Sequence, residues 1–425
     1  MTWHIDEKER NHLRALAVEQ AAIAALPVMK EREQMWYAHN DGTPGTTRPP
    51  VVISEVEFQK EFMTDDTLTC TSDLGRTVER QLVQNIFVHQ KINDDRVIPS
   101  TFRTDWDVDL DPGISIGREH ANDGHGGNLG FKFQHPITDL KRDLDLLKPP
   151  SCRVDRETTL ARQSFLEDLL GDILPIERVS TGCYGRFLML TENVVELMGM
   201  EAFFMAMYDT PDELHSLMRY LTDRALHVMR WAEREELLSL NNRNEGSCFG
   251  VSFNFTNKLP KREIGDGPVK LSDLWATMNS QETVGTSPEM FHEFCAPYYQ
   301  ELAAEFGMVY YGCCEPVHPI WDDIQQIPNL KKVSIPKWCD EAIIGEALRG
   351  TEIVYSRKPD PNFLSVSPQL DEDAWAKHIQ TTLENTQGVA VEFLIRDVCT
   401  LHGNIEKASR AVAIARETID RCRGR

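Results

Sequence analysis

The chain has 425 residues, of which 41% are hydrophobic and 26% charged, which is enough apolar material for a large core. Its net charge of −22 disfavours nucleic acid as a partner, because an acidic surface repels phosphate. No apolar run reaches the ~20 residues that a membrane helix needs, and the charged first twenty residues lack the apolar core of a signal peptide. We therefore expect a cytoplasmic protein that does not enter a membrane.

Short β-rich runs alternate with longer helical patterns, which indicates parallel strands joined by helical crossovers. Strands are predicted at residues 51–54, 97–104, 176–181, 251–255 or 274–278, 308–311, 332–335, 352–355 and 389–395. Several are almost continuously apolar, as expected for strands buried on both faces. About eight strand–helix units favour a single (β/α)8 (TIM) barrel. An open doubly wound sheet is the alternative, but no Gly-rich fingerprint follows the first strand.

Several helix starts carry local signals. Thr210 is followed by Pro, Asp and Glu, which is typical of a capping box with proline at the first helical position. The helix that follows is predicted to bury one apolar face, made of Leu214, Leu217, Met218, Leu221, Leu226 and Met229. Ser287 starts another helix in the same way, and Asn404 is predicted to cap the last helix, which runs through Ile419.

The chain is expected to form one domain with two additions. Residues 1–45 are predicted to be an N-terminal helical extension, and residues 46–425 to be the barrel. Residues 106–150 are rich in Gly, Asp and His and lack periodicity. They are predicted to be a long insertion after an early strand, and long loops in compact domains are usually functional or mobile.

The densest cluster of reactive residues follows the predicted strand at residues 308–311. Cys313, Cys314, Glu315 and His318 lie within six positions. Thiolate and imidazole are the ligands that zinc prefers, so this segment is a candidate metal site. The structural alternative is a strand end with buried cysteines and a glutamate that caps the next helix.

The last predicted strand is followed by a second group, Asp397, Cys399 and His402. In a barrel, functional residues sit at the carboxyl ends of the strands, so Cys399 could complete a metal site with Cys313. A helix-capping role for His402 and a salt bridge from Asp397 to Arg396 are the structural alternatives.

Polar residues also close two other strands. Asn279, Gln281 and Glu282 follow residues 274–278, where Glu282 could be a general acid–base group or a metal ligand. Asp105 closes the strand at residues 97–104 and could bind a cationic or hydrogen-bonding substrate group. Tyr184 follows the strand at residues 176–181, between two glycines that allow close backbone approach.

Taken in order, these segments resemble the uroporphyrinogen decarboxylase superfamily over roughly residues 25–420. The resemblance rests on residues 182–187, 211–214, 287–291, 297–298, 311–316, 327–330 before 332–335, and 396–402. It implies a (β/α)8 barrel with its active site at the carboxyl ends of the strands. It also places Asp105, Tyr184 and His402 near the positions of functional Asp, Tyr and His in the decarboxylases.

The resemblance favours the corrinoid-linked methyltransferase branch. Decarboxylases of the family bind the propionate groups of their tetrapyrrole substrate through an Arg-rich N-terminal segment. Residues 54–60, the equivalent segment here, contain no arginine. The methyltransferases that activate a thiol bind zinc through an HxC pair and a later Cys. Cys313 matches the first Cys, Cys399 could be the later one, and Tyr311 stands where the His would be. Other expected ligands are Cys314, Glu315 and His318.

The resemblance thus implies a place in one-carbon metabolism. A methyl group would pass between a small donor or acceptor and the cobalt of a separate corrinoid protein, with zinc as a cofactor. Tyr311, Asn279 and Gln281 are expected to bind the small molecule, and Asp105, Tyr184, Glu282 and His402 to be catalytic. No DxHxxG-like corrinoid motif is present, so cobalamin would be carried by the partner. The family also implies a monomer or a homodimer.

Two alternatives remain at this point. One is a decarboxylase or lyase that acts on a small acid or a tetrapyrrole and uses Asp105 and His402 without metal. The other is a non-catalytic barrel, against which the clustered Cys, His and Glu residues weigh.

Overall fold

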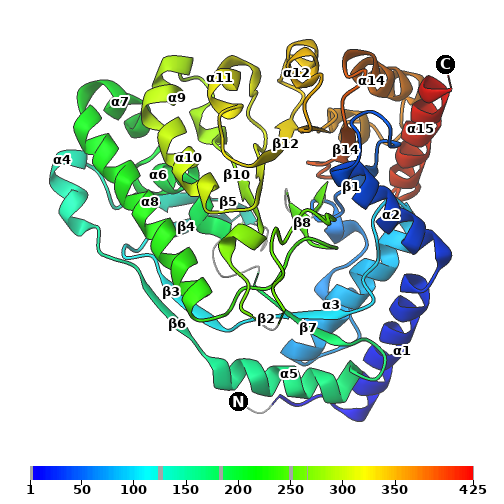
Figure 1. Ribbon diagram of the computed structural model, residues 1–425. Coiled ribbons are helices and arrows are strands. Elements are labelled where there is room, and N and C mark those ends of the chain that lie inside the picture. The colour runs from blue at the N-terminus through cyan, green and yellow to red at the C-terminus, as the bar shows by residue number, and fades with distance from the viewer. Residues whose placement is uncertain (1–2, 123–127, 181–184, 248–251, 266, 425) are drawn as a thin grey trace.

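The computed structural model describes residues 3–122, 128–180, 185–247, 252–265 and 267–424 (Figure 1). Its main sheet contains six parallel strands in the order β1-β14-β13-β12-β11-β10. They are β1 (Val51–Ile53), β14 (Val391–Ile395), β13 (Val354–Arg357), β12 (Leu330–Ile335), β11 (Met308–Tyr311) and β10 (Trp275–Met278). The six corresponding predictions are confirmed. The first strand of the chain pairs with the last one, through Val51–Phe393 and Ile53–Ile395.

The two other predicted strands form a separate parallel pair, β2 (Phe102–Asp105) with β7 (Ile176–Val179). Of the two predicted positions for one further strand, residues 274–278 lie in the main sheet as β10. At the other position, β9 (Ser252–Phe253) pairs antiparallel with β8 (Gly246–Ser247). Within the described residues, no strand pairing joins the main sheet to β2 and β7. The fold is therefore mixed α/β with a parallel sheet, and closure of all eight strands stays a prediction.

Helices follow most strands and cover one face of the sheet, where Val51, Ile53, Val333, Phe393 and Ile395 join the main core. The helices after β7 and along the main sheet are α6 (Leu190–Met198), α7 (Met200–Asp209), α8 (Pro211–Arg234), α9 (Pro288–Phe294), α10 (Ala296–Ala304), α11 (Trp321–Ile324), α12 (Glu341–Leu348), α13 (Asn362–Ser365), α14 (Glu372–Asn385) and α15 (Glu406–Arg423). Between β1 and β7 lie α3 (Asp73–Phe87), the π-helical turn η3 (Val88–Ile92), α4 (Leu140–Asp143) and α5 (Arg156–Leu170). Short 3-10 turns occur at η1 (Gln59–Glu61), η2 (Asp65–Thr67), η4 (Leu144–Leu146), η6 (Gly185–Leu188), η7 (Leu271–Asp273), η8 (Gln281–Thr283) and η9 (His318–Ile320).

The predicted helix at Pro211 is confirmed, and all six residues of its apolar face are buried. Two capping predictions were wrong. Thr210 makes no side-chain cap bond, and its ψ of 54° lies outside the extended region from which a cap side chain reaches the first turn. Helix α15 begins at Glu406 rather than at Asn404, whose amide instead donates to the carbonyl of Pro368 at 3.5 Å. Ser287 does cap α9, by accepting from the backbone N–H of Met290.

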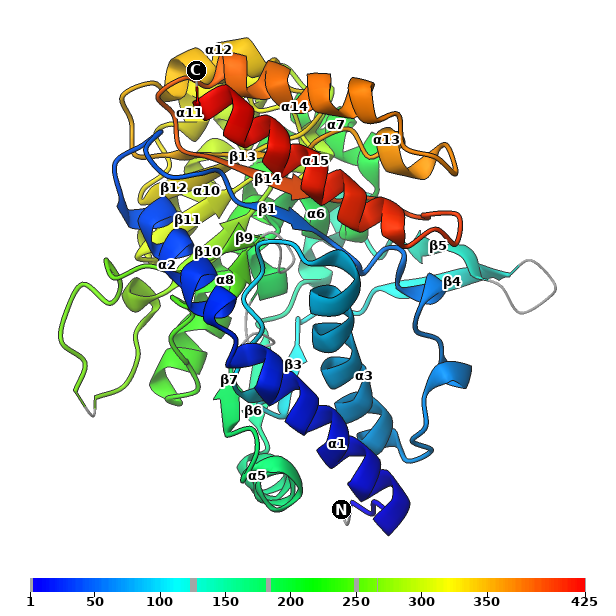
Figure 2. The same cartoon turned by 90° about the vertical axis from the view of Figure 1, so that its right-hand side faces the viewer.

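Residues 1–45 contain two helices, α1 (Glu7–Ala24) and α2 (Pro27–Asp41). Helix α1 lies beside α3, and α15 lies over β1 (Figure 2). Helix α2 covers the other face of the main sheet. Its Trp36 packs with Val52, Tyr310 and Leu394, which alternate with the residues that face the helical layer. The amide of Asn40 donates to the carbonyls of Phe253 and Phe255 at 2.9 and 2.8 Å. Helix α2 is therefore packed on the main sheet as part of its hydrophobic core.

A fully buried ion pair lies on this same face. Lys332 Nζ of β12 is 2.9 Å from Glu392 Oε2 of β14, and both side chains have no exposed area. The hydroxyl of Ser252 bonds to both partners, at 2.9 Å from Lys332 and 2.7 Å from Glu392. Ser356 donates a further bond to Glu392 at 2.7 Å, and His39 Nε2 of α2 lies 3.3 Å away. Because both charges are bonded, their burial is tolerated.

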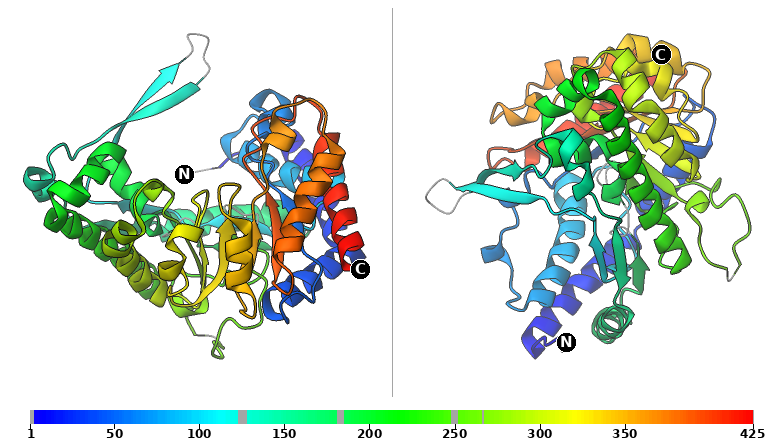
Figure 3. Two further views of the ribbon diagram at one scale, coloured as in Figure 1. Left: turned by 90° about the horizontal axis from the view of Figure 1, so that it is seen from above. Right: turned by 90° about the vertical axis from the view of Figure 1, so that its left-hand side faces the viewer.

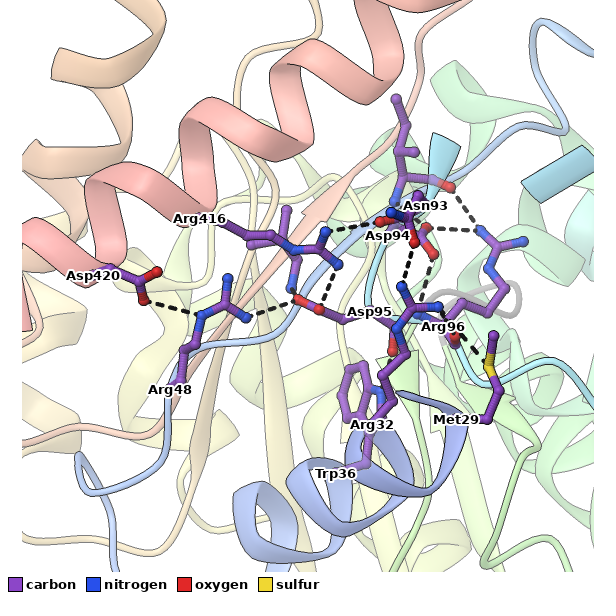
Figure 4. A network of polar contacts seen from close by, with 12 residues as sticks. Met29, Arg32, Trp36, Arg48, Asn93, Asp94, Asp95, Arg96, Arg416 and Asp420 are labelled. Carbon is purple, nitrogen blue, oxygen red and sulfur yellow. Dashed lines mark hydrogen bonds and ion pairs between the residues drawn. The ribbon is translucent and has the colours of Figure 1, made fainter. Parts of the chain in front are cut away.

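The free edge of β1 is covered by carboxylates instead of a strand (Figure 4). The backbone N–H of Val51 donates to Asp95 at 2.8 Å, and that of Ile53 donates to Asp94 at 3.0 Å. The N–H of Asp95 in turn donates to the carbonyl of Val51 at 3.0 Å. The strand predicted at residues 97–104 begins only at Phe102, and the β1 edge is met instead by Asp94 and Asp95, which precede the predicted strand.

Arginines pair with the carboxylates at the β1 edge, and the contribution of this network to stability can be tested by mutation. Arg416 of α15 lies 2.6 Å from Asp95, and Arg48 bridges Asp95 and the exposed Asp420. Asp95→Ala is expected to lower the free energy of unfolding by about 2 kcal/mol, because it removes an acceptor from a buried strand edge. Asp420→Ala is the matched control at the exposed end of the network and should change it by under ~0.5 kcal/mol. Urea unfolding midpoints measure both, and equal effects would contradict this account of the edge.

The insertion predicted at residues 106–150 contains two antiparallel pairs. Strand β3 (Val108–Asp111) pairs with β6 (Ser151–Val154), and β4 (Gly117–Asn122) pairs with β5 (Asn128–Gln134). The β4–β5 hairpin projects away from the body of the molecule (Figure 3). Arg118 at its base pairs with Glu196 of α6 at 3.0 Å. In the described part of the chain, no helix has the length and apolarity required to cross a bilayer.

Candidate active site

Polar and reactive residues gather where the parallel strands of the main sheet end. Because these strands are parallel and adjacent, their carboxyl ends lie along one edge, which is where α/β folds carry function. The segment after β11 contributes Cys313, Cys314 and Glu315, and the segment after β14 contributes Asp397 and Cys399. Residues 279–282 follow β10, and Lys358 follows β13.

The centre of this group is the thiol pair. Cys313 Sγ lies 3.6 Å from Cys314 Sγ, and Cys314 Sγ lies 3.8 Å from the carboxylate of Asp397. Cys399 Sγ lies 3.7 Å from the backbone carbonyl of Asp397. Asp397 itself has a φ of +61°, a left-handed conformation that is uncommon outside glycine and that Asp tolerates better than most residues. The ends of β11 and β14 are thus brought together, with Asp397 between Cys314 and Cys399.

The backbone of Cys313 is held from three sides. Its N–H donates to Glu315 at 2.8 Å, and its carbonyl accepts from Ser334 Oγ at 2.8 Å and Lys358 Nζ at 2.6 Å. The turn starts at Gly312, whose φ is +99°. A Cβ at Gly312 would stand 3.0 Å from the Cβ of Ser334, so only glycine fits there without displacement.

The hydrogen bond within the pair shifts the pKa values of the two thiols in opposite directions. The hydrogen bond from Cys313 lowers the pKa of Cys314 below that of an ordinary thiol; burial opposes this shift, and the Lys358 ammonium assists it. The same bond, followed by burial, raises the pKa of Cys313. Cys314 is therefore the more acidic thiol of the pair. Burial also raises the pKa of Glu315, although the N–H groups of Ser280 and Cys313 act against that shift.

The end of β10 is organised by hydroxyl groups. Ser280 Oγ lies 2.6 Å from the hydroxyl of Tyr311, and Tyr299 donates to the carbonyl of Asn279 at 2.5 Å. Burial raises the pKa of both tyrosines well above the ordinary value, so they stay protonated. Thr191 of α6 donates to Glu282 Oε2 at 2.7 Å. This bond fixes the orientation of the Glu282 carboxyl group.

A cavity of about 550 Å³ opens beside these groups. Its walls are mainly apolar, with one carboxyl, one amide and one thiol, and they are formed by Met200, Gln281, Glu282, Val284, Cys314, Pro316 and Trp338. The lining comes from α7, from the segments after β10 and β11, and from the segment after β12. A cavity of this size, with few polar groups in an apolar wall, suits a small organic molecule.

The buried part of this site contains further residues predicted to bind substrate. Tyr311 is fully buried, and Asn279 is 3% exposed, so both lie behind the cavity wall. The Asn279 amide nitrogen donates to Met189 Sδ at 2.8 Å, and its Oδ1 makes no hydrogen bond within the described part of the chain. Gln281 and Glu282 reach the cavity itself.

Other predicted site residues lie elsewhere. Asp105 lines a separate cleft of about 650 Å³ together with Trp106, Asp107 and Arg162. His402 is exposed, has a φ of +58°, and its Nε2 is bonded to the carbonyl of Ser365 at 2.8 Å. Tyr184 lies outside the described residues.

The predicted zinc ligands do not come together as a set. Glu315 is engaged by two backbone N–H groups, and His318 Nδ1 accepts from the N–H of Asp340 at 3.2 Å. Two thiolates on one tetrahedral zinc stand about 3.8 Å apart, given a Zn–S distance of ~2.3 Å, so the Cys313–Cys314 pair alone matches that spacing. Over the described ranges, no three His, Cys, Asp or Glu side chains are arranged to hold a metal ion. The described residues alone therefore do not form a complete zinc site.

Several contributors to the site were missed in the sequence, among them Lys358, Trp338 and Thr191. Lys358 was missed because the predicted strand ended at residue 355, whereas β13 runs to Arg357 and places Lys358 at its carboxyl end. Trp338 stands three residues after β12. Only the general rule that functional residues follow the carboxyl ends of strands (the strand-end rule) could have selected it. Thr191 lies on α6 and reaches Glu282 across 91 positions, which no local pattern indicates.

Comparisons with known proteins leave the family open. No family model matches the chain, and no curated protein matches it by sequence. Among solved structures, the chain is similar to a methyltransferase from Methanosarcina mazei, with 14% sequence identity and a TM-score of 0.49. The match covers 91% of this chain and 98% of the other. At this level of similarity, it does not by itself assign an activity.

Proposed function

We propose that this protein is a methyltransferase that moves a methyl group between a small molecule in the Cys314 cavity and the cobalt of a separate corrinoid protein. The observation that carries the proposal is the cavity at the carboxyl ends of β10, β11 and β12, lined by Glu282, Gln281 and Cys314 in an otherwise apolar wall. The segments after β11 and β14 that resemble methyltransferases of the uroporphyrinogen decarboxylase superfamily follow strands that end at this edge. With β2 and β7 added to the six-stranded sheet, we infer the eight-stranded barrel of that superfamily.

Glu282 is the group best placed to transfer a proton. When a methyl group leaves oxygen or sulfur, the heteroatom gains negative charge, and a carboxylic acid beside it can protonate it. In the reverse direction the carboxylate removes the proton from the acceptor. Thr191 holds Oε2 of Glu282 in both cases, so the carboxyl group keeps its direction toward the cavity.

The remaining cavity residues bind and orient. Met200, Val284, Pro316 and Trp338 offer apolar contacts, and Gln281 can donate one hydrogen bond and accept another. Such a wall favours a small, largely apolar molecule. The corrinoid would supply a nucleophilic cobalt, and the exposed side chains of Val284 and Trp338 at the rim would face that partner.

A decarboxylase or lyase that uses Asp105 and His402 receives less support. These two residues would have to act on one substrate. Asp105 lines the cleft with Trp106 and Arg162, and His402 is not part of that lining. His402 is also already bonded to Ser365.

Zinc at the thiol pair stays a prediction, and no step above depends on it. Elemental analysis of the purified protein tests it, together with Cys313→Ser and, as a control, Cys70→Ser in a buried site remote from the pair. The sequence predicts about one zinc per chain, lost in Cys313→Ser and retained in Cys70→Ser. Protein prepared without chelator and still free of zinc would exclude the prediction and leave acid–base chemistry at Glu282.

The proposed activity is tested with free cob(I)alamin in place of the partner. Methyl ethers, methyl thioethers and methylated amines are offered as donors under strictly reducing conditions, and methylcobalamin formation is followed by its absorbance. We expect protein-dependent methylation from at least one donor class, at a rate proportional to protein concentration. Failure of every donor, in protein that binds none of them by calorimetry, would contradict the proposal.

A further inference from the structure

The two sulfur atoms of Cys313 and Cys314 are unusually close for neighbours in sequence. Successive side chains of an extended strand point to opposite faces, which separates adjacent sulfur atoms. Here the chain leaves β11 at Tyr311 and turns at Gly312, and the two Sγ atoms come within 3.6 Å. Both lie on the same side of the backbone as a result.

This arrangement is built into the fold. The N–H and the carbonyl of Cys313 are both bonded to buried groups, namely Glu315 on one side and Ser334 with Lys358 on the other. All three partners are at most 3% exposed. Ser334 and Lys358 thus hold the carbonyl of the peptide that joins the two cysteines, and Glu315 holds the N–H of the preceding peptide. These buried hydrogen bonds keep the two thiols beside each other, because each is costly to leave unmade.

Access to the pair is one-sided. Cys314 lines the cavity, whereas Cys313 lies behind it and is 7% exposed. A small oxidant that enters the cavity therefore meets Cys314 first. The Cys313 thiol lies 3.6 Å from it, an arrangement that is typical of a redox-sensitive cysteine and its resolving cysteine.

We propose that Cys313 and Cys314 are a modification site, an adjacent dithiol that hydroperoxides oxidise reversibly to a disulfide. The chemistry does not require the proposed methyl transfer; only its expected effect on activity rests on that function. Because cob(I)alamin chemistry needs reducing conditions, such a site would stop the enzyme when oxidant is present.

The steps balance as follows. Cys314 sulfur attacks one oxygen of hydrogen peroxide, the O–O bond breaks, and one water leaves, which gives a sulfenic acid on Cys314. Cys313 sulfur then attacks Cys314 sulfur, the S–S bond forms, the S–O bond breaks, and a second water leaves. Two thiols and one peroxide thus give one disulfide and two waters. The thiols lose two electrons, which the peroxide accepts.

The disulfide would be easy to reduce. Adjacent Cα atoms are held about 3.8 Å apart by the peptide bond, whereas disulfides usually join Cα atoms about 4.4 to 6.8 Å apart. The bond between adjacent cysteines is therefore strained, and strained disulfides are the labile, regulatory ones. Closure would draw Cys314 Sγ away from Asp397 and change the wall of the cavity.

The test reads the thiols directly by mass. Full-length protein with chelator present is treated with a small excess of hydrogen peroxide, the reaction is stopped with catalase, free thiols are alkylated, and peptides are mapped. We expect the peptide with Cys313 and Cys314 to lose two hydrogen atoms and to escape alkylation, and dithiothreitol to restore both thiols. In Cys313→Ser, Cys314 should instead be trapped as a sulfenic acid by dimedone. Cys399→Ser, which removes the nearby exposed thiol, should still form the Cys313–Cys314 disulfide.

Three results would overturn the proposal. They are two alkylatable thiols after peroxide treatment, a disulfide between Cys314 and Cys399, and direct conversion of Cys314 to sulfinic acid that dithiothreitol does not reverse. Methyl transfer, once detected, should be lost on oxidation and return with dithiothreitol. If no methyl transfer is found at all, the mass readout still decides the fate of the dithiol, so the two proposals fail separately.

Discussion

Glu282→Gln is expected to lower the rate of methyl transfer from a methyl ether by about 100-fold or more, the usual contribution of a positioned general acid. Glutamine keeps the shape of the side chain and can still accept the hydrogen bond from Thr191. It cannot protonate the departing oxygen. The loss should therefore appear in the maximal rate, with donor affinity changed little, when methylcobalamin formation is measured against donor concentration.

Two comparisons sharpen this test. When a quaternary amine gives up a methyl group, the demethylated amine leaves as a neutral molecule and needs no proton. Glu282→Gln should therefore slow methyl transfer from such donors far less than transfer from ethers. Glu289→Gln, on the exposed start of α9, is the matched control and should leave all rates unchanged. An equal loss for ethers and cationic donors would show that Glu282 supports the structure of the cavity rather than proton transfer.

The largest effect on stability is expected from Lys332→Met. The substitution keeps most of the side-chain volume but leaves Glu392 as an uncompensated buried charge, which typically costs about 3 to 5 kcal/mol. The neighbouring Lys331→Met is the matched control: Lys331 contacts the carbonyl of Glu352, and its ion-pair partner, the Glu352 carboxylate, is largely exposed. It should cost under ~1 kcal/mol. Chemical unfolding monitored by circular dichroism measures both.

The same pair predicts a pH dependence. Burial acts to raise the pKa of Glu392, but the charge of Lys332 and its hydrogen bonds lower it to about 2, from 4.5. A carboxyl group with a depressed folded-state pKa stabilises the protein above its unfolded pKa and loses that contribution as the pH falls through the folded value. Wild type should lose this contribution between about pH 4.5 and pH 2. In Lys332→Met the pKa of Glu392 should rise, so the penalty should shrink in that interval. An unchanged acid profile in this variant would contradict the role of the pair.

The parallel strands could be predicted because their own residues carry the signal. Met308–Tyr311 is a short apolar run buried at every position, and β11 has the predicted bounds. The edge of β1 could not be predicted. The carboxylates of Asp94 and Asp95 accept hydrogen bonds from the N–H groups of Ile53 and Val51, more than 40 positions away. These side-chain bonds replace the bonds that a neighbouring strand would make, and no local sequence pattern predicts them.

The candidate site divides in the same way. Cys313, Cys314 and Glu282 stood out because reactive side chains directly follow a strand, and the strand-end rule places such residues together. The rule fails to say which way each side chain turns. Glu315 was expected to bind metal, yet it turns inward to accept two backbone N–H groups. His402 closes the right segment, but its left-handed backbone directs it to Ser365 at the surface.

The most direct test of the central claim follows a labelled methyl group. A donor identified with cob(I)alamin is prepared with a deuterated methyl group, and the products formed by wild type and Glu282→Gln are analysed by mass spectrometry. The account predicts one labelled methyl group on cobalt for each demethylated donor molecule in wild type, with formation of both products slowed together in the variant. Demethylated product without label on cobalt would contradict methyl transfer to a corrinoid, and decarboxylated product would point to a lyase instead.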